Sequence, residues 1–140
     1  MSSSPNPWVY KGVEFTADHI ENYTGFVYII TNIHTDRKYI GKKIFTTTSR
    51  VKQKHKTRRK VIRKQSNWQD YYGSSPSLLK DVEQYGRESF KREIIHLCIN
   101  KSQMAYFEAK EQFMQGCLES DQWYNEHIMC RVRKDNLKLF

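Results

Sequence analysis

This 140-residue sequence has only three cysteines, no long apolar run, and one long segment without acidic residues. The first two of these features exclude classes of protein. The three cysteines, Cys98, Cys117 and Cys130, form no CxxC pair, so neither a zinc knuckle nor a disulfide framework is expected. No stretch approaches 18 consecutive apolar residues, so we expect no membrane span. The N-terminus, MSSSPNPW, has neither a basic start nor an apolar run, which argues against a signal peptide.

Acidic residues are missing from one continuous part of the chain. Between Arg37 and Gln69 there are 13 Lys and Arg residues and no Asp or Glu, although the net charge of the whole chain is +9. Such a block attracts polyanions through phosphate neutralisation and counterion release. A solvated loop that only keeps the protein soluble is the alternative. Because aromatic residues such as Phe45 and Trp68 border the block, and aromatic-edged basic grooves suit nucleic acids, we favour a nucleic-acid partner.

Three segments have the composition of β-strands. The stretches FVYII (26–30) and RKYIG (37–41) are rich in β-branched and aromatic residues, and the polar residues between them predict a hairpin. SFKREIIHLC (89–98) predicts a third strand. We expect WVYKGVEFT (8–16) to be a short edge strand or a cover for the core.

Three further segments predict helices. Residues 50–65 are rich in Lys, Gln and Arg without a helix breaker, and their low apolar content places the expected helix on the surface. Ser75 can cap a second helix that ends at Gly86, and Ser102 can cap a third that stops at Gly116. The element order predicts an α/β fold in which helices flank a small antiparallel or mixed sheet of three strands.

Two tyrosines of the expected hairpin can share one face of the sheet, because strand side chains alternate in direction. Tyr28 and Tyr39 are 11 residues apart with a turn between them, and Gly41 would allow another backbone or a phosphate to approach closely. Two phenols beside a cationic patch can act on a phosphodiester, one on the attacking water and the other on a phosphate oxygen. Simple aromatic packing across the strands is the alternative.

The sequence around these tyrosines resembles the paired signature of the GIY-YIG nuclease family. Residues 26–28 stand at the first triplet and residues 39–41 match the second, although Gly25 lies one position early and Phe26 replaces the family glycine. Further on, YYGSSPSLLKDVEQYGRESFKREII resembles the middle of phage-type homing endonuclease members. AYFEAKEQF resembles the glutamate helix of the family, and WYN its terminal asparagine. The resemblance spans residues 25–125.

The resemblance implies a compact α/β nuclease module over residues 25–130, which includes the basic segment 42–64. Residues 1–24 would form an N-terminal tail and cover segment, and residues 131–140 a C-terminal tail. The implied function is a metal-dependent DNA endonuclease that uses Mg²⁺ (or Mn²⁺), is associated with a phage or mobile element, and acts in the cytoplasm of a bacterium or infected host cell. The alternatives are a non-catalytic nucleic-acid-binding protein that retains the fold and a basic RNA-binding protein.

The resemblance also implies roles for individual residues. Tyr28 would activate the attacking water or hydrogen-bond to the group that does, and Tyr39 would position the water or the phosphate. One helix glutamate would be the only protein ligand of the metal, which suits Mg²⁺ because this ion keeps most of its waters. Glu108 and Glu111 lie on the same side of one helix, and we prefer Glu108 because an apolar pair precedes it, as in the family pattern.

An arginine is expected to stabilise the phosphate in the transition state. Arg50 lies near the family spacing, 11 residues after Tyr39, and Arg58, Arg59 or Arg63 could serve instead. The other predicted contacts to DNA are either cationic or close to the expected phosphate site. They are Lys42, Lys43, Lys54, Lys56, Arg58, Arg59, Lys60, Arg63, Ser74 and Asn125.

Overall fold

A central mixed sheet organises the chain. The computed structural model describes residues 6–139, so the first five residues of the predicted tail and residue 140 lie outside the described residues. Within the described part the sheet has five strands in the order β2-β1-β7-β3-β4, with β1 parallel to β7 and the other pairs antiparallel. The strands are β1 (Val9–Tyr10), β2 (Val13–Glu14), β3 (Gly25–Asn32), β4 (Lys38–Ile44) and β7 (Phe90–Cys98).

The predicted three-stranded sheet is therefore the core of a wider one. The expected hairpin is confirmed as β3–β4, and the expected third strand is confirmed as β7. The N-terminal segment 8–16 both extends and covers the sheet, because β1 and β2 form its far edge while Trp8 is 1% exposed.

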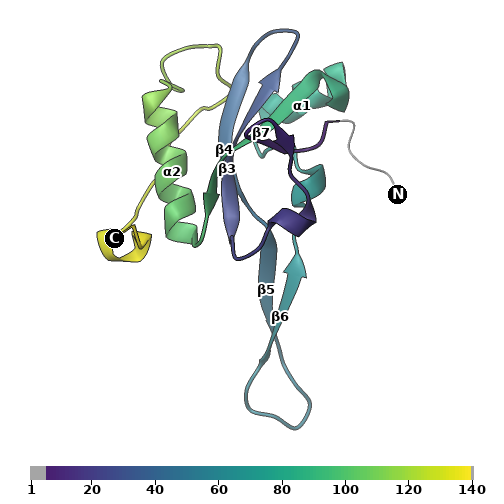
Figure 1. The fold of residues 1–140 in the computed structure, drawn as a ribbon, viewed down its shortest axis with the longest axis vertical. Coiled ribbons are helices and arrows are strands. Elements are labelled where there is room, and N and C mark those ends of the chain that lie inside the picture. The colour runs from purple at the N-terminus through teal and green to yellow at the C-terminus, as the bar shows by residue number, and fades with distance from the viewer. Residues whose placement is uncertain (1–5, 140) are drawn as a thin grey trace.

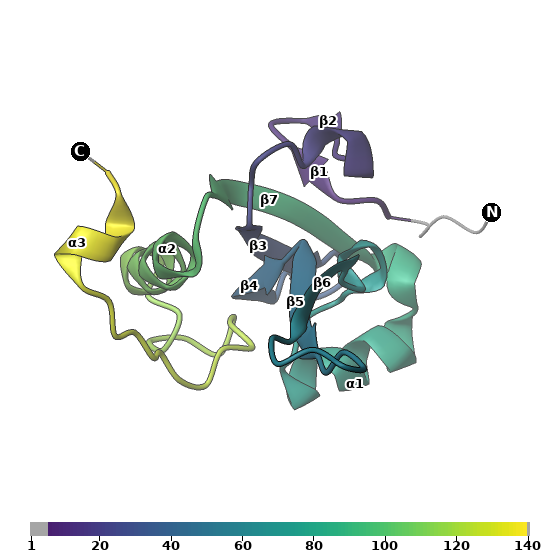
Figure 2. The same ribbon diagram turned by 90° about the horizontal axis from the view of Figure 1, so that it is seen from below.

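Helices α1 (Pro76–Tyr85) and α2 (Lys101–Met114) cover opposite faces of the sheet (Figures 1 and 2). Phe26 and Tyr28 face the α1 side, where they pack with Leu78. Val27 faces the α2 side and packs with Met104. The nearly continuous apolar run of β3 follows from this arrangement, since a strand that is covered on both faces needs apolar side chains in both directions.

The caps of the two helices agree in part with the sequence prediction. Ser75 caps α1 by accepting a hydrogen bond from the backbone N–H of Leu78 (3.4 Å), and Gly86 is the residue after its end. The predicted cap of α2 was wrong by two residues. Asn100, not Ser102, accepts the hydrogen bond from the Gln103 N–H at 2.7 Å, since asparagine caps helices as well as serine does.

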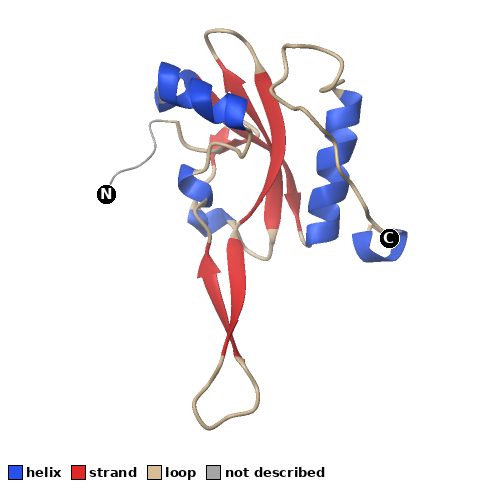
Figure 3. Cartoon of the chain, turned by 180° about the vertical axis from the view of Figure 1, so that it is seen from behind, coloured by secondary structure: helices blue, strands red, loops and turns tan. Residues whose placement is uncertain are grey.

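The helix predicted for residues 50–65 was also wrong. Strands β5 (Thr46–Val51) and β6 (Lys60–Gln65) form a two-stranded antiparallel ribbon that projects from the body (Figures 1 and 3). A helix would bring like charges together at i,i+4 spacings, for example Lys52 and Lys56, which destabilises it. The β-branched residues of both strands favour an extended backbone instead.

Short elements complete the chain. The 3-10 turns η1 (Ala17–His19), η2 (Trp68–Asp70) and η3 (Arg87–Ser89) connect the strands and helices, and α3 (Lys134–Leu137) lies beside the start of α2. No helix among the described residues has the length and apolar character needed to cross a membrane. All three cysteines are free, and Cys98 and Cys117 are buried.

A buried arginine fixes the segment that leads to α1. Arg92 on β7 is 1% exposed, and its guanidinium donates hydrogen bonds to the carbonyl oxygens of Asn6, Gln69 and Tyr71 at 2.6–2.9 Å. Burial lowers the pKa of Arg92 to about 10, so the group keeps its charge at neutral pH. The three carbonyls satisfy most of its donors, and they tie residues 69–71 to the sheet.

Candidate active site

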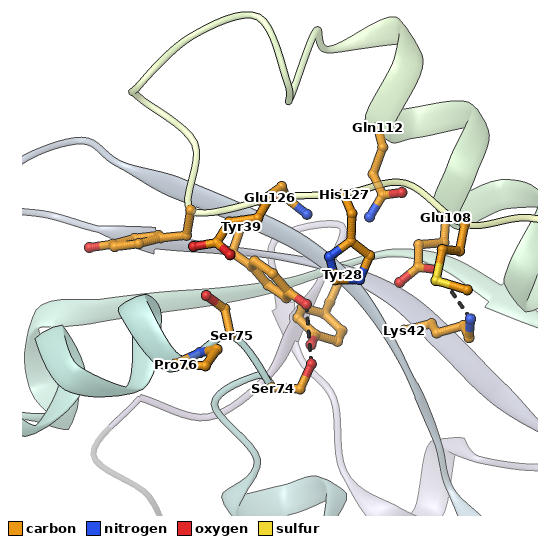
Figure 4. A pocket seen from close by; sticks show the side chains of 13 residues that line it. Tyr28, Tyr39, Lys42, Ser74, Ser75, Pro76, Glu108, Gln112, Glu126 and His127 are labelled. Carbon is orange, nitrogen blue, oxygen red and sulfur yellow. Dashed lines mark hydrogen bonds and ion pairs between the residues drawn. The ribbon is translucent and has the colours of Figure 1, made fainter.

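A cavity of about 410 Å³ lies beside the edge strand β4, where four separate parts of the chain meet (Figure 4). Strands β3 and β4 contribute Tyr28, Tyr39 and Lys42, and α2 contributes Glu108 and Gln112. The remaining wall comes from the loop that enters α1 and from the C-terminal segment. These residues are Ser74, Ser75, Pro76, Tyr124, Asn125, Glu126, His127 and Met129.

The two tyrosines share one sheet face, as predicted. Tyr28 pairs with Gly41 and Ile30 pairs with Tyr39 in the β3–β4 register, so the phenols are diagonal neighbours with ring centroids 6.2 Å apart. The Tyr39 hydroxyl lies 3.2 Å from the Ser74 hydroxyl. Tyr28 is fully buried, and its hydroxyl lines the cavity without a partner in hydrogen-bond geometry among the described residues, although the Tyr71 hydroxyl is near enough to raise its pKa. An unpaired buried hydroxyl is costly, which marks this atom as a candidate contact for a ligand.

Burial also controls the protonation of these phenols. It raises the pKa of Tyr28 well above the ordinary value, and the neighbouring Tyr71 and Tyr39 raise it further. The pKa of Tyr39 is raised by burial as well, while its contact with Ser74 opposes the shift. Both phenols are therefore protonated at neutral pH, and each can donate a hydrogen bond into the cavity.

Gly41 makes room for both rings. A Cβ atom at this position would contact the Tyr28 hydroxyl, would lie 2.6 Å from Tyr28 Cζ, and would lie 2.8 Å from Tyr39 Cε2. Real Cβ atoms essentially never approach other atoms so closely, so any other residue at position 41 must displace the phenols. This explains why a glycine follows the second tyrosine.

Gly41→Ala is expected to destabilise the protein by about 1–3 kcal/mol, the usual cost of overpacking a filled core. Combining it with Tyr28→Phe removes the nearest of the three contacts, so the double variant should unfold at a higher temperature than Gly41→Ala alone. Thermal unfolding of the wild type, both single variants and the double variant measures this coupling. Strictly additive effects would show that the alanine is accommodated without touching the phenol.

Glu108 enters the cavity from α2. Its Oε1 lies 3.2 Å from Nζ of Lys42, and its side chain is 13% exposed. Burial raises the pKa of Glu108, while the positive charge of Lys42 and, to a lesser extent, His127 opposes this shift. Glu111 points elsewhere, because its Oε1 lies 3.0 Å from Nε2 of His96 on β7. The structure thus separates two glutamates that helical spacing alone could not distinguish.

Asn125 holds the edge strand in place. Its side chain accepts a hydrogen bond from the Ile40 N–H (3.1 Å) and donates one to the Ile40 carbonyl (2.8 Å). Gln112 on α2 donates to the same carbonyl at 3.1 Å. Asn125 therefore positions the residues on either side of Ile40, namely Tyr39 and Gly41, and it also lines the cavity.

The structure brings together six of the predicted site residues, and it places the others away from the cavity. Those that line the cavity are Tyr28, Tyr39, Lys42, Ser74, Glu108 and Asn125. Arg50 lies on the exposed ribbon strand β5, and no arginine of residues 6–139 lines the cavity. Lys43 lies 4.2 Å above the Tyr71 ring. The remaining predicted contacts are exposed residues of the ribbon and its tip, which are Lys54, Lys56, Arg58, Arg59, Lys60 and Arg63.

The sequence prediction missed Gln112, Glu126 and His127. His127 lies between the two phenols and Glu108 in the cavity wall (Figure 4). Residues 124–131 have no regular secondary structure, so no periodicity marks which side chains point inward. For Glu126 and His127 the only available signal was their position one and two residues after Asn125, directly behind the WYN motif. For Gln112 it was the i,i+4 spacing from Glu108 on the same helix.

Comparison with family models gives one match across most of the chain. Residues 8–128 match the family described as "Putative endonuclease segE, GIY-YIG domain". Comparison with the curated proteins found no match, and comparison with the solved structures found none. The matched range contains every residue that lines the cavity except Met129.

Proposed function

Because the chain belongs to the GIY-YIG endonuclease family, a family of nucleases that hydrolyse phosphodiester bonds in nucleic acid, we propose that its substrate is DNA and that cleavage depends on Mg²⁺ or Mn²⁺. The observation that carries this proposal is the convergence of Tyr28, Tyr39 and Glu108, from three different elements, on one cavity. A phage or mobile-element association and a cytoplasmic location belong to the same proposal and rest on the resemblance to phage-type members.

The donor set of the cavity fits a hard divalent cation. Glu108 supplies a carboxylate, and a cation, the Lys42 ammonium, already lies 3.2 Å from it. No cluster of three or more His, Cys, Asp and Glu side chains exists among the described residues. An ion at Glu108 would therefore complete its shell with water and phosphate oxygens, as Mg²⁺ readily does. Such an ion would stabilise negative charge on the phosphate and the leaving oxygen.

The protein's own side chains divide the remaining work. The Tyr28 hydroxyl, which has no partner in hydrogen-bond geometry among the described residues, is free to donate to a phosphate oxygen or to accept a hydrogen bond from the attacking water. Tyr39 provides a second hydroxyl, which is held by its contact with Ser74. The Tyr28 and Tyr39 ring centroids are 6.2 Å apart. His127 in the same wall offers an imidazole, which can accept a proton from the attacking water. Lys42 is placed to contact the phosphate once it leaves Glu108.

A cleavage assay on supercoiled plasmid tests the proposal. With Mg²⁺ the protein should nick or linearise the plasmid, and EDTA should stop the reaction. A protein that binds the plasmid but never cuts it with Mg²⁺ or Mn²⁺ would instead support the non-catalytic alternative. An RNA substrate of matched length serves as the comparison, because preferential cleavage of RNA would contradict the choice of DNA.

We expect the cleavage rate to fall as the solution is acidified. The fall should begin at a higher pH than it would if Glu108 were an exposed glutamate. Glu108 must be ionised to hold a cation, and burial raises its pKa above the usual value of about 4.3. The Tyr28 and Tyr39 phenols stay neutral there, since their pKa values are also raised. Lys42→Met removes the main opposing charge, so the acid limb of the pH–rate profile should move to still higher pH.

Unfolding experiments separate this effect from acid denaturation. A carboxyl whose pKa is raised in the folded protein stabilises the fold at low pH, and this stabilisation is lost as the pH rises through the raised pKa. Activity should therefore decline on acidification while Glu108 itself causes no loss of thermal stability. A melting temperature that falls in step with activity would show that unfolding, and not titration of Glu108, limits cleavage.

Binding to duplex DNA should depend strongly on salt. Residues 42–64 contain 11 Lys and Arg residues, and if half of them contact phosphates, log K against log salt should have a slope of roughly −4 to −6. Replacing Lys54, Lys56, Arg58, Arg59 and Lys60 with glutamine should flatten this slope by several units. All five residues are exposed, so the melting temperature should hardly change. A flat slope for the wild type would place the DNA elsewhere.

A further inference from the structure

The β5–β6 ribbon is anchored at its base and free along its length. At the base, Phe45 and Trp68 are buried with ring centroids 5.1 Å apart, and the Ser66 N–H donates to the Phe45 carbonyl at 2.8 Å. Beyond this point every residue of both strands is exposed. The ribbon extends away from both the sheet and the cavity-forming helices (Figure 3). Its root is thus fixed by the core, while its two faces and its tip are open to a partner.

The strand register sorts the side chains of the ribbon onto two different faces, because directly opposite residues point the same way. One face, here called the arginine face, carries Thr46, Thr48, Arg50, Val61, Arg63 and Gln65. The other face, here called the lysine face, carries Thr47, Ser49, Val51, Lys60, Ile62 and Lys64. Each face therefore has two cations, but of different chemistry.

The charge of the ribbon defines its partner as a polyanion. Residues 46–65 contain nine Lys and Arg residues and no Asp or Glu. The width of the two-stranded ribbon indicates which groove of a DNA duplex it can enter. The major groove of B-DNA, about 12 Å wide, admits a two-stranded ribbon and presents a distinct pattern for each base pair, whereas the minor groove is only about 6 Å wide and its pattern is degenerate.

The arginine face has the side chains that distinguish base pairs. Arginine contacts guanine O6 and N7, and threonine bonds to either kind of base edge. Gln65 lies at the root of the ribbon, where its Oε1 accepts a hydrogen bond from Trp68 Nε1 at 3.1 Å, so Arg50, Arg63 and the threonines are the polar readers of this face. Val61, which is 55% exposed, offers an apolar surface for the thymine methyl group. Lysine acts as a flexible point charge, so the lysine face suits phosphate contact.

From these observations we propose that the ribbon enters the major groove of double-stranded DNA with its arginine face toward the base edges, and that it gives the nuclease its sequence preference. The proposal rests on the proposed function as a DNA nuclease. It also gives Arg50 a role in base recognition, in place of the transition-state role that the sequence predicted.

Two double variants test the proposal, because they remove the same charge from opposite faces. Arg50→Gln with Arg63→Gln alters the arginine face, and Lys60→Gln with Lys64→Gln alters the lysine face. Each protein is incubated in EDTA with a pool of random-sequence DNA duplexes, and the bound fraction is sequenced. Because binding is measured without cleavage, a catalytic role of Arg50 cannot affect the result.

The wild type should enrich particular sequences. The arginine-face variant should lose this enrichment by about tenfold or more for each base contact. The lysine-face variant should keep the enrichment and flatten the salt slope by roughly two units, whereas the arginine-face variant should change the slope less, because its cations contact bases and not phosphates. Duplexes with 7-deazapurines, which lack the N7 acceptor, should bind the wild type more weakly, whereas netropsin in the minor groove should not compete.

The failures of the two proposals are distinguishable. Binding without any sequence enrichment, equal loss of enrichment in both variants, or competition by netropsin would overturn the ribbon proposal while leaving the DNA nuclease intact. A wild type that binds no duplex at all would overturn both.

Discussion

Glu108→Gln is expected to reduce DNA cleavage by about a thousandfold or more. Loss of an ion that contributes several kcal/mol of transition-state stabilisation corresponds to a rate change of that size. Glutamine keeps the shape of the side chain and can still accept a hydrogen bond from Lys42, which lies 3.2 Å from Glu108. Binding of duplex DNA in EDTA should therefore remain close to that of the wild type.

Glu111→Gln is the matched control, because it makes the same chemical change less than one helical turn away. Glu111 contacts His96 outside the cavity, so its replacement should leave cleavage within a few-fold of the wild type. Titration with Mn²⁺, followed by electron paramagnetic resonance, gives a second measurement. Weaker Mn²⁺ binding in Glu111→Gln than in Glu108→Gln, with the matching loss of cleavage, would reverse the assignment of the ligand.

Tyr28→Phe is expected to reduce cleavage by about 10²–10³-fold, the range typical of losing one hydrogen-bond donor to the transition state, without lowering stability. The hydroxyl that it removes is buried and unpaired in the described protein. An unpaired buried donor costs about 1–3 kcal/mol, so its removal should leave the free energy of unfolding unchanged or increase it. Loss of activity together with unchanged or increased stability is the signature of a group held in place for a ligand.

Tyr124→Phe provides the stability control. Tyr124 is 1% exposed, and its hydroxyl donates to Asp81 Oδ2 at 2.7 Å and accepts from Asn32 Nδ2 at 3.2 Å. Removing this hydroxyl leaves Asn32 Nδ2 without its partner and leaves Asp81 Oδ2 with only the ion pair to Arg37 at 4.0 Å, so it should cost about 1.5–3 kcal/mol. Urea denaturation of both variants measures the contrast. If Tyr28→Phe loses as much stability as Tyr124→Phe, its hydroxyl has a structural partner and is not held for a ligand.

The parts of the fold that were predictable are those in which local and tertiary requirements agree. FVYII is β-branched and apolar, and β3 is covered on both faces. Ser75, Pro76 and Gly86 mark the ends of α1 through backbone chemistry that does not depend on neighbours. Composition also predicted that the basic segment attracts polyanions, although it gave the wrong secondary structure for residues 50–65.

The parts that were missed depend on partners distant in sequence. Strand β1 pairs with β7 through Val9 and Glu93, a contact that no local pattern specifies. His127 reaches the cavity only because Asn125 binds the backbone of Ile40, 85 residues away. Helical spacing could not separate Glu108 from Glu111, and the preference for Glu108 came from the family pattern alone. Their different surroundings, Lys42 beside Glu108 and His96 beside Glu111, depend on the tertiary fold.

The path of residues 122–125 along β4 has a consequence for solubility. The Lys38 N–H donates to Gln122, the Tyr124 N–H donates to Lys38, and the Asn125 amide pairs with both backbone groups of Ile40. Together these contacts occupy hydrogen-bonding groups that an edge strand would otherwise offer to a strand of another molecule. Loss of the chain beyond residue 121 would therefore expose a template for intermolecular β-pairing, and the truncated protein would aggregate through the same edge that lines its cavity.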